Sequence, residues 1–312
     1  TRAIEEIRLL TWNVEHFMRM FDQVRMPNRS RDRGELFRDE EDLYEVARTL
    51  GLPDVDADVV CIQECCSQEM LEHFNKEWLD GRYETIKVFP GNVEGQWLGM
   101  LIKPGWKVLE VRDKYHRQRD PEDDPRVRGA KEHGGLAEGN LLFSRGPVFV
   151  KLRSPRGNVI WVGTTHVKSK YGNNEAVTRW RIRELQRTRE ICESLLADGK
   201  SDYLAMMGDF NDDFGKDFYE RKVGIDAVEV MLQGKGHAKL VSPTRTLAAE
   251  NDKLSTYHCQ IKPPKYRSFI DHVFLSAEAG KRVSKTRVVD NPIAAVASDH
   301  YPVLTVLKLP RP

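Results

Sequence analysis

The sequence has no apolar run of about eighteen residues, the length that a membrane-spanning helix requires. Its N-terminal segment, TRAIEEIRLL, also lacks the charged-then-apolar plan of a signal peptide. These two absences exclude a membrane span from the printed chain. Because the first residue is Thr1 rather than methionine, a mature form that has already lost a leader stays open.

The chain also lacks an excess of charge of either sign. Its 49 Lys and Arg residues nearly balance its 48 Asp and Glu residues, which leaves a formal net charge of +1. No overall field therefore steers the protein onto nucleic acid, and any polyanion must be held by local groups. The 40% apolar and 31% charged residues are typical of a soluble globular protein with a substantial core.

Cysteine is scarce and its count is odd. Five cysteines exclude a fully paired disulfide framework, which favours a reducing compartment such as the cytoplasm. No linker, internal repeat or low-complexity tract divides the chain, so residues 1–312 are expected to form a single domain.

Strand-like apolar runs and helical patterns intermix along the chain, which indicates an α/β or α+β core. The expected strands are IRLLTWNV, ADVVCIQE, LGMLIKP, VFVKLR, NVIWVGTTHV, YLAMMGDF, FIDHVFLS and YPVLTVLKL. The expected helices are EEDLYEVARTLGL, SQEMLEHFNKEWL and NEAVTRWRIRELQRTREICESLLADG. Two charged stretches, 19–38 and 112–133, are predicted to be surface loops.

Several of the expected strands end in polar side chains, where open sheets commonly present functional groups. Carboxylates with an amide oxygen form a hard ligand set for Mg²⁺ or Mn²⁺, and His with Asp can manage protons. Each segment alone has an ordinary explanation, such as a turn or a helix cap, but the ordered set points to one site. Its members are Asn13, Glu64, His166, Asp209, Asn211, Asp299 and His300.

The ordered set resembles the endonuclease/exonuclease/phosphatase superfamily, which includes deoxyribonuclease I and the exonuclease III-type abasic-site endonucleases. The resemblance spans residues 8 to 307, and GDFND and SDHYPV are its most specific elements, followed by TWNVEHF and IQE. NVEHF, THVKSK and GDFND are most similar to bacterial Mg²⁺-dependent nuclease-like members. The resemblance implies a four-layered α/β sandwich, with two packed mixed β-sheets flanked by helices.

The resemblance also implies roles for individual residues. Glu64 would be the principal metal-binding carboxylate, and Asn13 and Asp299 would complete or orient the metal site. Asp209 would position or deprotonate the attacking water, and Asn211 would hold the scissile phosphate or Asp209. His300 would face the phosphate, with Asp271 fixing its ring. His166, also expected in the catalytic group, occupies a position that is His in deoxyribonuclease I-type members and commonly Tyr in abasic-site enzymes. We find no counterpart of the carboxylate that pairs with this histidine in deoxyribonuclease I.

Basic residues near the expected site have two interpretations. Lys168 and Lys170, together with Arg29 and Arg31 of the first charged loop, could contact phosphate. They could equally be solvated surface charge. The arginine-rich helix from 175 to 197 is balanced by glutamates, so we interpret it as a salt-bridged outer helix rather than a nucleic-acid surface.

The sequence therefore predicts a divalent-metal-dependent phosphodiester hydrolase, a nuclease acting on DNA or RNA through metal-assisted in-line attack of water. An alternative is a phosphatase or phosphodiesterase that acts on a phospholipid head group, an inositol phosphate or another small organophosphate. A third is a catalytically silent binding module of the same fold, against which the retention of the full polar set argues.

Overall fold

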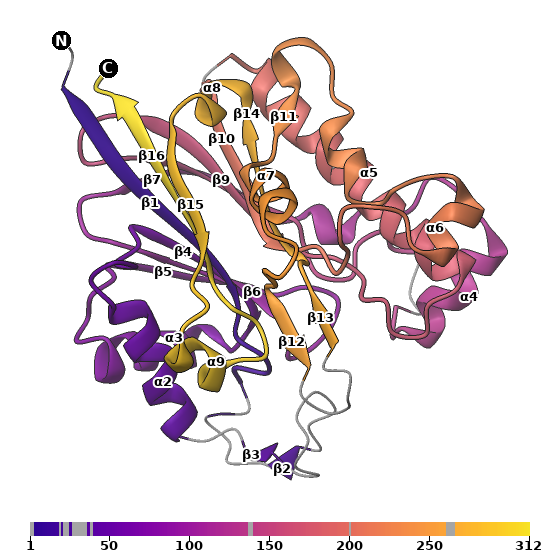
Figure 1. Cartoon of the computed structure of the whole chain (residues 1–312), viewed down its shortest axis with the longest axis horizontal. Helices are drawn as coiled ribbons and strands as arrows, with labels where there is room; N and C mark the ends of the chain where they lie inside the picture. The colour runs from indigo at the N-terminus through magenta and orange to yellow at the C-terminus, as the bar shows by residue number, and fades with distance from the viewer. Residues whose placement is uncertain are drawn as a thin grey trace.

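The computed structural model describes residues 3–18, 20, 25–26, 36–37, 40–136, 140–199, 201–259 and 266–312. Two six-stranded mixed sheets pack face to face, with helices on both outer sides (Figure 1). This arrangement confirms the predicted four-layered α/β sandwich. No described helix has the length and apolar character needed to cross a membrane.

The first sheet is built around the N- and C-terminal strands. Its order is β15 (Val283–Val288), β16 (Val303–Pro310), β1 (Ile4–Asn13), β4 (Val59–Cys65), β6 (Trp97–Ile102) and β5 (Thr85–Phe89). Strands β1 and β4 are parallel, whereas β1 and β16 are antiparallel and bring Ile4 opposite Pro310. The two chain ends therefore lie together, at the end of β1 that is opposite to Asn13 (Figure 1).

The second sheet repeats this plan with a parallel pair at its centre. Its order is β11 (Leu240–Val241), β14 (Asp271–Ser276), β10 (Tyr203–Asp209), β9 (Val159–His166), β8 (Val148–Arg153) and β7 (Lys107–Arg112). Two short antiparallel strand pairs also occur, β2 (Arg25–Met26) with β3 (Leu36–Phe37) and β12 (Tyr257–Cys259) with β13 (Tyr266–Ser268).

Alternation along the central strands builds three apolar layers. In β4, Val59 and Cys61 face the other sheet, whereas Val60 and Ile62 face the outer helices. In β10, Ala205 and Met207 face inward. Because both faces of these strands are buried, the sequence shows continuous apolar runs rather than alternation with polar residues.

Helices cover the outer face of each sheet (Figure 1). The first sheet is covered by α2 (Glu40–Gly51), α3 (Gln68–Trp78) and α9 (Pro292–Ala297), and the second by α5 (Glu175–Ala197). Helices α4 (Pro125–His133) and α6 (Phe218–Val223) pack against α5, whereas α7 (Pro243–Glu250) and α8 (Ala277–Gly280) adjoin β14. Short 3₁₀ turns occupy Tyr115–Arg117, Glu229–Leu232 and Gly236–Ala238.

The second charged stretch is not simply the loop that we predicted, because it contains α4. Asp124 caps this helix by accepting a hydrogen bond from the Arg126 N–H at 2.9 Å, and Pro125 occupies its first turn. Lys131 is fully buried, with Nζ 2.8 Å from Asp120 Oδ2. The charged composition of this stretch therefore includes a buried ion pair, Lys131 with Asp120, and is not only solvent-exposed charge.

The long helix α5 is salt-bridged, as predicted. Arg187 pairs with Glu190 at 3.0 Å and Arg189 with Glu193 at 3.3 Å. Arg181 is fully buried and pairs with Asp212 at 2.7 Å, so part of this helix faces the interior rather than solvent.

Gly208 allows the close approach of β10 to β9 next to the site. Its φ is +154°, and an added Cβ would overlap the carbonyl oxygen of Thr165, its partner in the parallel register. Gly129 lies in α4, where an added Cβ would meet nothing within 4 Å.

We predict that Gly208→Ala lowers the free energy of unfolding by about 2 to 4 kcal/mol, because it combines backbone strain with overpacking. The matched substitution Gly129→Ala should be neutral or should stabilise the helix by up to about 1 kcal/mol. Denaturant unfolding of both variants measures the difference. Equal midpoints for the two variants would contradict the packing described here.

Candidate active site

Three neighbouring strands of the second sheet bring His166, Asp209 and Asp271 together. Asp209 ends β10, and the register places it opposite His166 of β9 on one side and Asp271 of β14 on the other. His166 Nε2 lies 3.3 Å from Asp209 Oδ2. All three residues are buried, so their charges interact strongly with one another.

The first sheet contributes Asn13 and Glu64 from the ends of β1 and β4. Asn13 Nδ2 donates to Asp209 Oδ2 at 2.9 Å and lies 3.3 Å from Glu64 Oε1. Its amide oxygen accepts the Glu15 N–H at 2.9 Å. In this orientation the Asn13 NH₂ group faces two carboxylates and its amide oxygen is occupied by a backbone N–H. This arrangement suits the predicted role of orienting the metal site better than that of a direct ligand.

The backbone at Glu64 is left-handed, with a φ of +56°, and the pairing of β4 with β6 is irregular at this point. This kink turns the carboxylate out of the strand, and the His16 N–H donates to Oε2 at 2.8 Å. Burial alone would raise the pKa of Glu64, but His16, which also donates its backbone N–H, and the His300 ring hold the pKa below its usual range. Glu64 is therefore ionised, and its side chain is still 14% exposed, which leaves the carboxylate accessible from solvent.

His300 and Asp271 form a buried ion pair, with Nδ1 2.8 Å from Oδ2. Burial alone would lower the pKa of His300, but the carboxylates of Asp271 and Asp209 raise the pKa well above its usual value. Burial raises the pKa of Asp271 to about 6. The proton therefore resides on the imidazole, whose Nε2 lies 3.8 Å from Asp209 Oδ2 and 3.9 Å from Asp299 Oδ1.

His166 is electrically different from His300. Burial lowers its pKa, and the nearby guanidinium of Arg145 lowers the pKa further. Within the described part of the chain its Nδ1 has no hydrogen-bond partner, in keeping with the missing carboxylate noted in the sequence. The site thus contains one neutral histidine and one imidazolium, both facing Asp209.

Asn211 and Asp299 fix the edges of this group. The Asn211 N–H donates to Asp209 Oδ1 at 2.8 Å, and its Nδ2 donates to the Val167 carbonyl at 2.9 Å. Asn211 therefore holds Asp209 and the strand that carries His166. The Asp299 N–H donates to Glu15 Oε2 at 3.1 Å, which ties the C-terminal site residues to the first strand.

The basic residues proposed for phosphate are placed differently. Lys168 Nζ donates to the backbone and hydroxyl oxygens of Ser169, and Lys170 Nζ pairs with Asp212 and, at 3.1 Å, with Asp217. Burial lowers the pKa of Lys168 to about 8. The structure thus uses both lysines to hold the loop after β9, and their contact with phosphate stays a prediction. Arg29 and Arg31 lie outside the described residues.

Sequence reasoning missed a polar support beneath His166. Arg145 donates from Nε to the His166 carbonyl at 3.2 Å and from Nη2 to the Val167 carbonyl at 2.8 Å. Glu184 of α5 accepts from the Ser144 and Lys168 N–H groups, both at 2.7 Å. Neither residue ends a strand, so only the three-dimensional fold reveals their position. Glu15 and His16, by contrast, adjoin Asn13 in the NVEH motif and could have been noticed.

The carboxylates of the site fit a hard divalent cation. Asp209 and Asp271 offer oxygens that lie within 4.8 Å of each other, and Asp271 Oδ1 is buried without a hydrogen-bond partner among the described residues. His300, as an imidazolium, is no ligand and instead balances their charge. Glu64 and Asp299 add carboxylates at the same end of the sandwich. Oxygen-rich sets of this kind suit Mg²⁺ and Mn²⁺.

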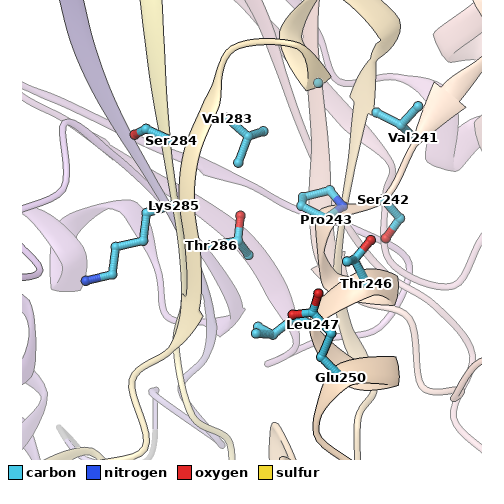
Figure 2. Close-up of a pocket in the computed structure, with 11 residues that line it drawn as sticks. Val241, Ser242, Pro243, Thr246, Leu247, Glu250, Val283, Ser284, Lys285 and Thr286 are labelled. Atoms are coloured by element: carbon cyan, nitrogen blue, oxygen red, sulfur yellow. The ribbon is translucent and has the colours of Figure 1, made fainter.

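A separate pocket of about 410 Å³ lies between α7 and β15, and none of the predicted site residues lines it. Figure 2 shows Thr286 directed towards α7 and Lys285 directed away from it. The active-site candidate is therefore distinct from this groove.

Solved structures of low sequence identity share the fold over nearly the whole chain. A truncated TDP2 from Caenorhabditis elegans matches with a TM-score of 0.61 at 12% identity, covering 97% of this chain and 98% of that one. TDP2 from D. rerio, complexed with a single-strand DNA product, matches with a TM-score of 0.59 at 15% identity, covering 96% and 98%. The human Nocturnin catalytic domain matches with a TM-score of 0.57 at 15% identity, covering 99% and 98%. At these identities the likeness shows the fold alone.

No curated protein matches the sequence. The family model described as "Endonuclease/Exonuclease/phosphatase family" matches residues 10–300, a span that runs from β1 to His300. This span includes every described residue of the site. The chain therefore belongs to the endonuclease/exonuclease/phosphatase family.

Proposed function

We propose that this protein is a divalent-metal-dependent phosphodiester hydrolase that acts on nucleic acid. The observation that carries the proposal is the convergence on one carboxylate, Asp209 of the second sheet, of three groups: Asn13 at the end of β1, His300 in the segment that leads into β16 of the same first sheet, and His166 of β9. A binding module of the same fold would have no evident need for such an arrangement. The D. rerio relative with its DNA product supports nucleic acid as the substrate class.

The charge of the site supports a role for a metal ion. Glu64, Asp209 and Asp299 are carboxylates that would repel a phosphodiester, and His300 supplies one compensating positive charge. Bound at Glu64 with Asp299, a divalent cation would polarise the phosphoryl oxygens and stabilise the leaving alkoxide. The carboxylates that bind the cation would thus be those that otherwise repel the phosphodiester.

In this proposal Asp209 orients the attacking water. Burial alone would raise its pKa, but His166 and His300 hold the pKa well below its usual range, so the carboxylate is ionised at neutral pH. Such a weak base orients water and accepts its proton only transiently, while the water oxygen forms the new bond to phosphorus and the ester oxygen leaves. Hydrogen bonds from Asn13 and the Asn211 N–H fix the direction of the carboxylate.

In this proposal His300 neutralises the phosphate. Its imidazolium is held by Asp271 through Nδ1, so Nε2 remains directed towards Asp209. A fixed positive charge in a buried site stabilises charge that develops on the non-bridging oxygens. His166, being neutral, would instead donate a hydrogen bond to Asp209.

A substrate panel with Mg²⁺ or Mn²⁺ tests the function directly. We expect hydrolysis of plasmid, single-stranded DNA or RNA and none in excess chelator. Glu64→Gln should weaken metal binding roughly tenfold or more, because it removes a ligand charge with little change of shape. Calorimetric titration of metal measures this, with Glu69→Gln on the exposed start of α3 as the matched control.

Full activity in chelator would eliminate the metal mechanism. If only inositol phosphates or phospholipid head groups are hydrolysed, the substrate class is not nucleic acid but one of these small phosphate esters.

The Asp271–His300 pair generates a second prediction. Asp271→Asn removes the largest influence that raises the pKa of His300, so this pKa should fall towards or below its ordinary value. A histidine NMR titration of the metal-free protein measures the change, with Asp252→Asn at an exposed position as the control. An unchanged His300 titration in the Asp271 variant would show that the ion pair does not hold the proton.

A further inference from the structure

Three exposed cations lie close together in the chain, in the segment that follows β7. Lys114, Arg117 and Arg119 belong to the second charged stretch, and each of them is exposed. Among the residues that the structure describes, no carboxylate forms an ion pair with any of the three. Their charge is therefore not neutralised by the protein itself.

The carboxylates of the same stretch are mostly engaged by other cations. Glu110 pairs with Arg112 at 2.7 Å, and the buried Lys131 pairs with Asp120 at 2.8 Å. Between residues 110 and 124 the other paired carboxylates are Glu122 with Arg183, Asp123 with Arg128 and Asp124 with Arg126. This leaves one carboxylate, Asp113, against the three cations, so the segment keeps a net positive charge.

The backbone of this segment is fixed by hydrogen bonds from neighbouring elements. Asn92 Nδ2 donates to the His116 carbonyl at 2.7 Å. Arg187 Nε of α5 donates to the Gln118 side-chain oxygen at 3.0 Å. The cations therefore extend from an ordered support, which lowers the entropy cost of binding a ligand.

A single 3₁₀ turn sets the direction of two of the cations. The Arg117 N–H donates to the Lys114 carbonyl at 3.1 Å, and residues three apart in such a turn lie on one face. Between them, the Tyr115 ring packs edge-on against the buried Phe149, with 6.0 Å between centroids. Lys114 and Tyr115 also line a hollow of about 380 Å³. Two cations thus lie side by side at a concave surface.

Strand register places this segment at the same end of the sandwich as the candidate active site. Arg112, the last residue of β7, is opposite Phe149 of β8, which is opposite Gly163 of β9. His166 lies three residues further along β9. With the usual spacings within and between strands, Arg112 is roughly 14 Å from His166. The chain leaves β7 in the direction of the site.

A second connection joins the cations to His166 through the segment before β8. Arg119 forms an antiparallel bridge with Leu141. Arg145 follows four residues later, and its carbonyl accepts the His166 N–H at 3.3 Å. The three cations therefore border the site rather than the remote end of the sheet, where the chain ends lie.

We propose that Lys114, Arg117 and Arg119 form a basic strip that binds phosphates of a nucleic acid strand on one side of the scissile bond. The inference rests on the proposed function and names the path of the strand, from the site towards the end of β7. The two lysines after β9 are engaged within their own loop. Because the net charge is only +1, local cations of this kind must hold a polyanion.

A membrane surface fits the strip less well than a nucleic acid strand does. Peripheral membrane segments combine cations with apolar side chains that enter the lipid. Residues 113–119 include no exposed large apolar side chain, and the nearest one in the sequence, Leu109, is single. A row of phosphates needs only the cations.

The test measures the binding of a single-stranded oligothymidine by fluorescence anisotropy in Ca²⁺ at several salt concentrations. A triple variant, Lys114→Gln with Arg117→Gln and Arg119→Gln, removes the strip and leaves the site residues in place. The log-log slope of the association constant against salt should become shallower by roughly 2, because each phosphate contact with a single strand contributes about 0.7. Hydrolysis of bis(p-nitrophenyl) phosphate with Mn²⁺, and the unfolding midpoint, should equal those of the parent.

A charge-matched control separates the strip from net charge. Arg282, Lys285 and Lys308 are exposed, and none forms an ion pair within the described part of the chain. They lie on or next to β15 and β16, towards the end remote from the site. Replacing these three by Gln changes the net charge equally, so the slope should match that of the parent. An equal change of slope in both triple variants would overturn the proposal.

Further outcomes distinguish the strip from the function on which it rests. A parent-like slope in the strip variant overturns the strip even if the parent hydrolyses DNA or RNA. If the parent hydrolyses the small diester but shows no salt-dependent binding of the strand, the strip and the nucleic acid substrate are both wrong, and the phosphodiesterase stands. Strip-dependent binding to phosphatidylserine vesicles but not to the strand overturns the proposal in favour of a membrane. Strip-dependent binding of the strand without diester hydrolysis supports the strip and removes the proposed catalysis.

Discussion

The hydrogen bond from Asn13 Nδ2 to Asp209 Oδ2 joins β1 of one sheet to β10 of the other. Most of the interface between these sheets is apolar, and apolar contacts are not directional. A second polar contact between the sheets runs from Gln63 Nε2 of β4, the residue before Glu64, to Thr164 Oγ1 of β9 at 3.0 Å. These directional bonds fix the relative position of the sheets where the site is assembled, and therefore the position of Glu64 of the first sheet relative to His166 of the second.

Much of the surrounding structure serves to hold Asn13 in place. The Ser298 hydroxyl donates to the Asn13 carbonyl at 2.7 Å, and Trp12 Nε1 donates to the His300 carbonyl at 2.8 Å. The first and last segments of the chain thus support each other at one end of the sandwich. Buried carboxylates are destabilising unless they are compensated, and here the compensation comes from His300, from backbone N–H groups and from the expected cation.

The fold and the gathering of the site were predictable from the sequence for separate reasons. Apolar runs such as VVCIQ and YLAMMGD are long enough to bury both faces of a strand, and the ends of parallel strands meet at one edge. That rule pairs Asn13 with Glu64 and, in the other sheet, His166 with Asp209. The packing of two sheets that brings the pairs together was an expectation from the family resemblance.

What the sequence could not reveal depends on burial and on partner choice. Lys170 reads as a surface cation, yet Asp212 and Asp217 engage it. Arg145 and Glu184 occur in segments with no strand-end signal, and their contacts need the loops on either side of His166 to be in place first. The orientation of the Asn13 amide, likewise, is set by the Glu15 N–H and two carboxylates that are distant in sequence. Ion pairs and amide orientation are properties of the assembled fold.

The dependence of the site on contact between the sheets is tested most directly by a double-mutant cycle of Asn13→Ala and Asp209→Ala. The value of kcat/KM for a small phosphodiester is measured in saturating Mg²⁺, with Asn13→Ala and Tyr44→Ala as the uncoupled control pair. If Asn13 acts through Asp209, the double variant should lose little more than Asp209→Ala alone, which corresponds to a coupling of about 1 to 3 kcal/mol. Additive losses in the Asn13 and Asp209 cycle would contradict the account, because the two residues would then act independently.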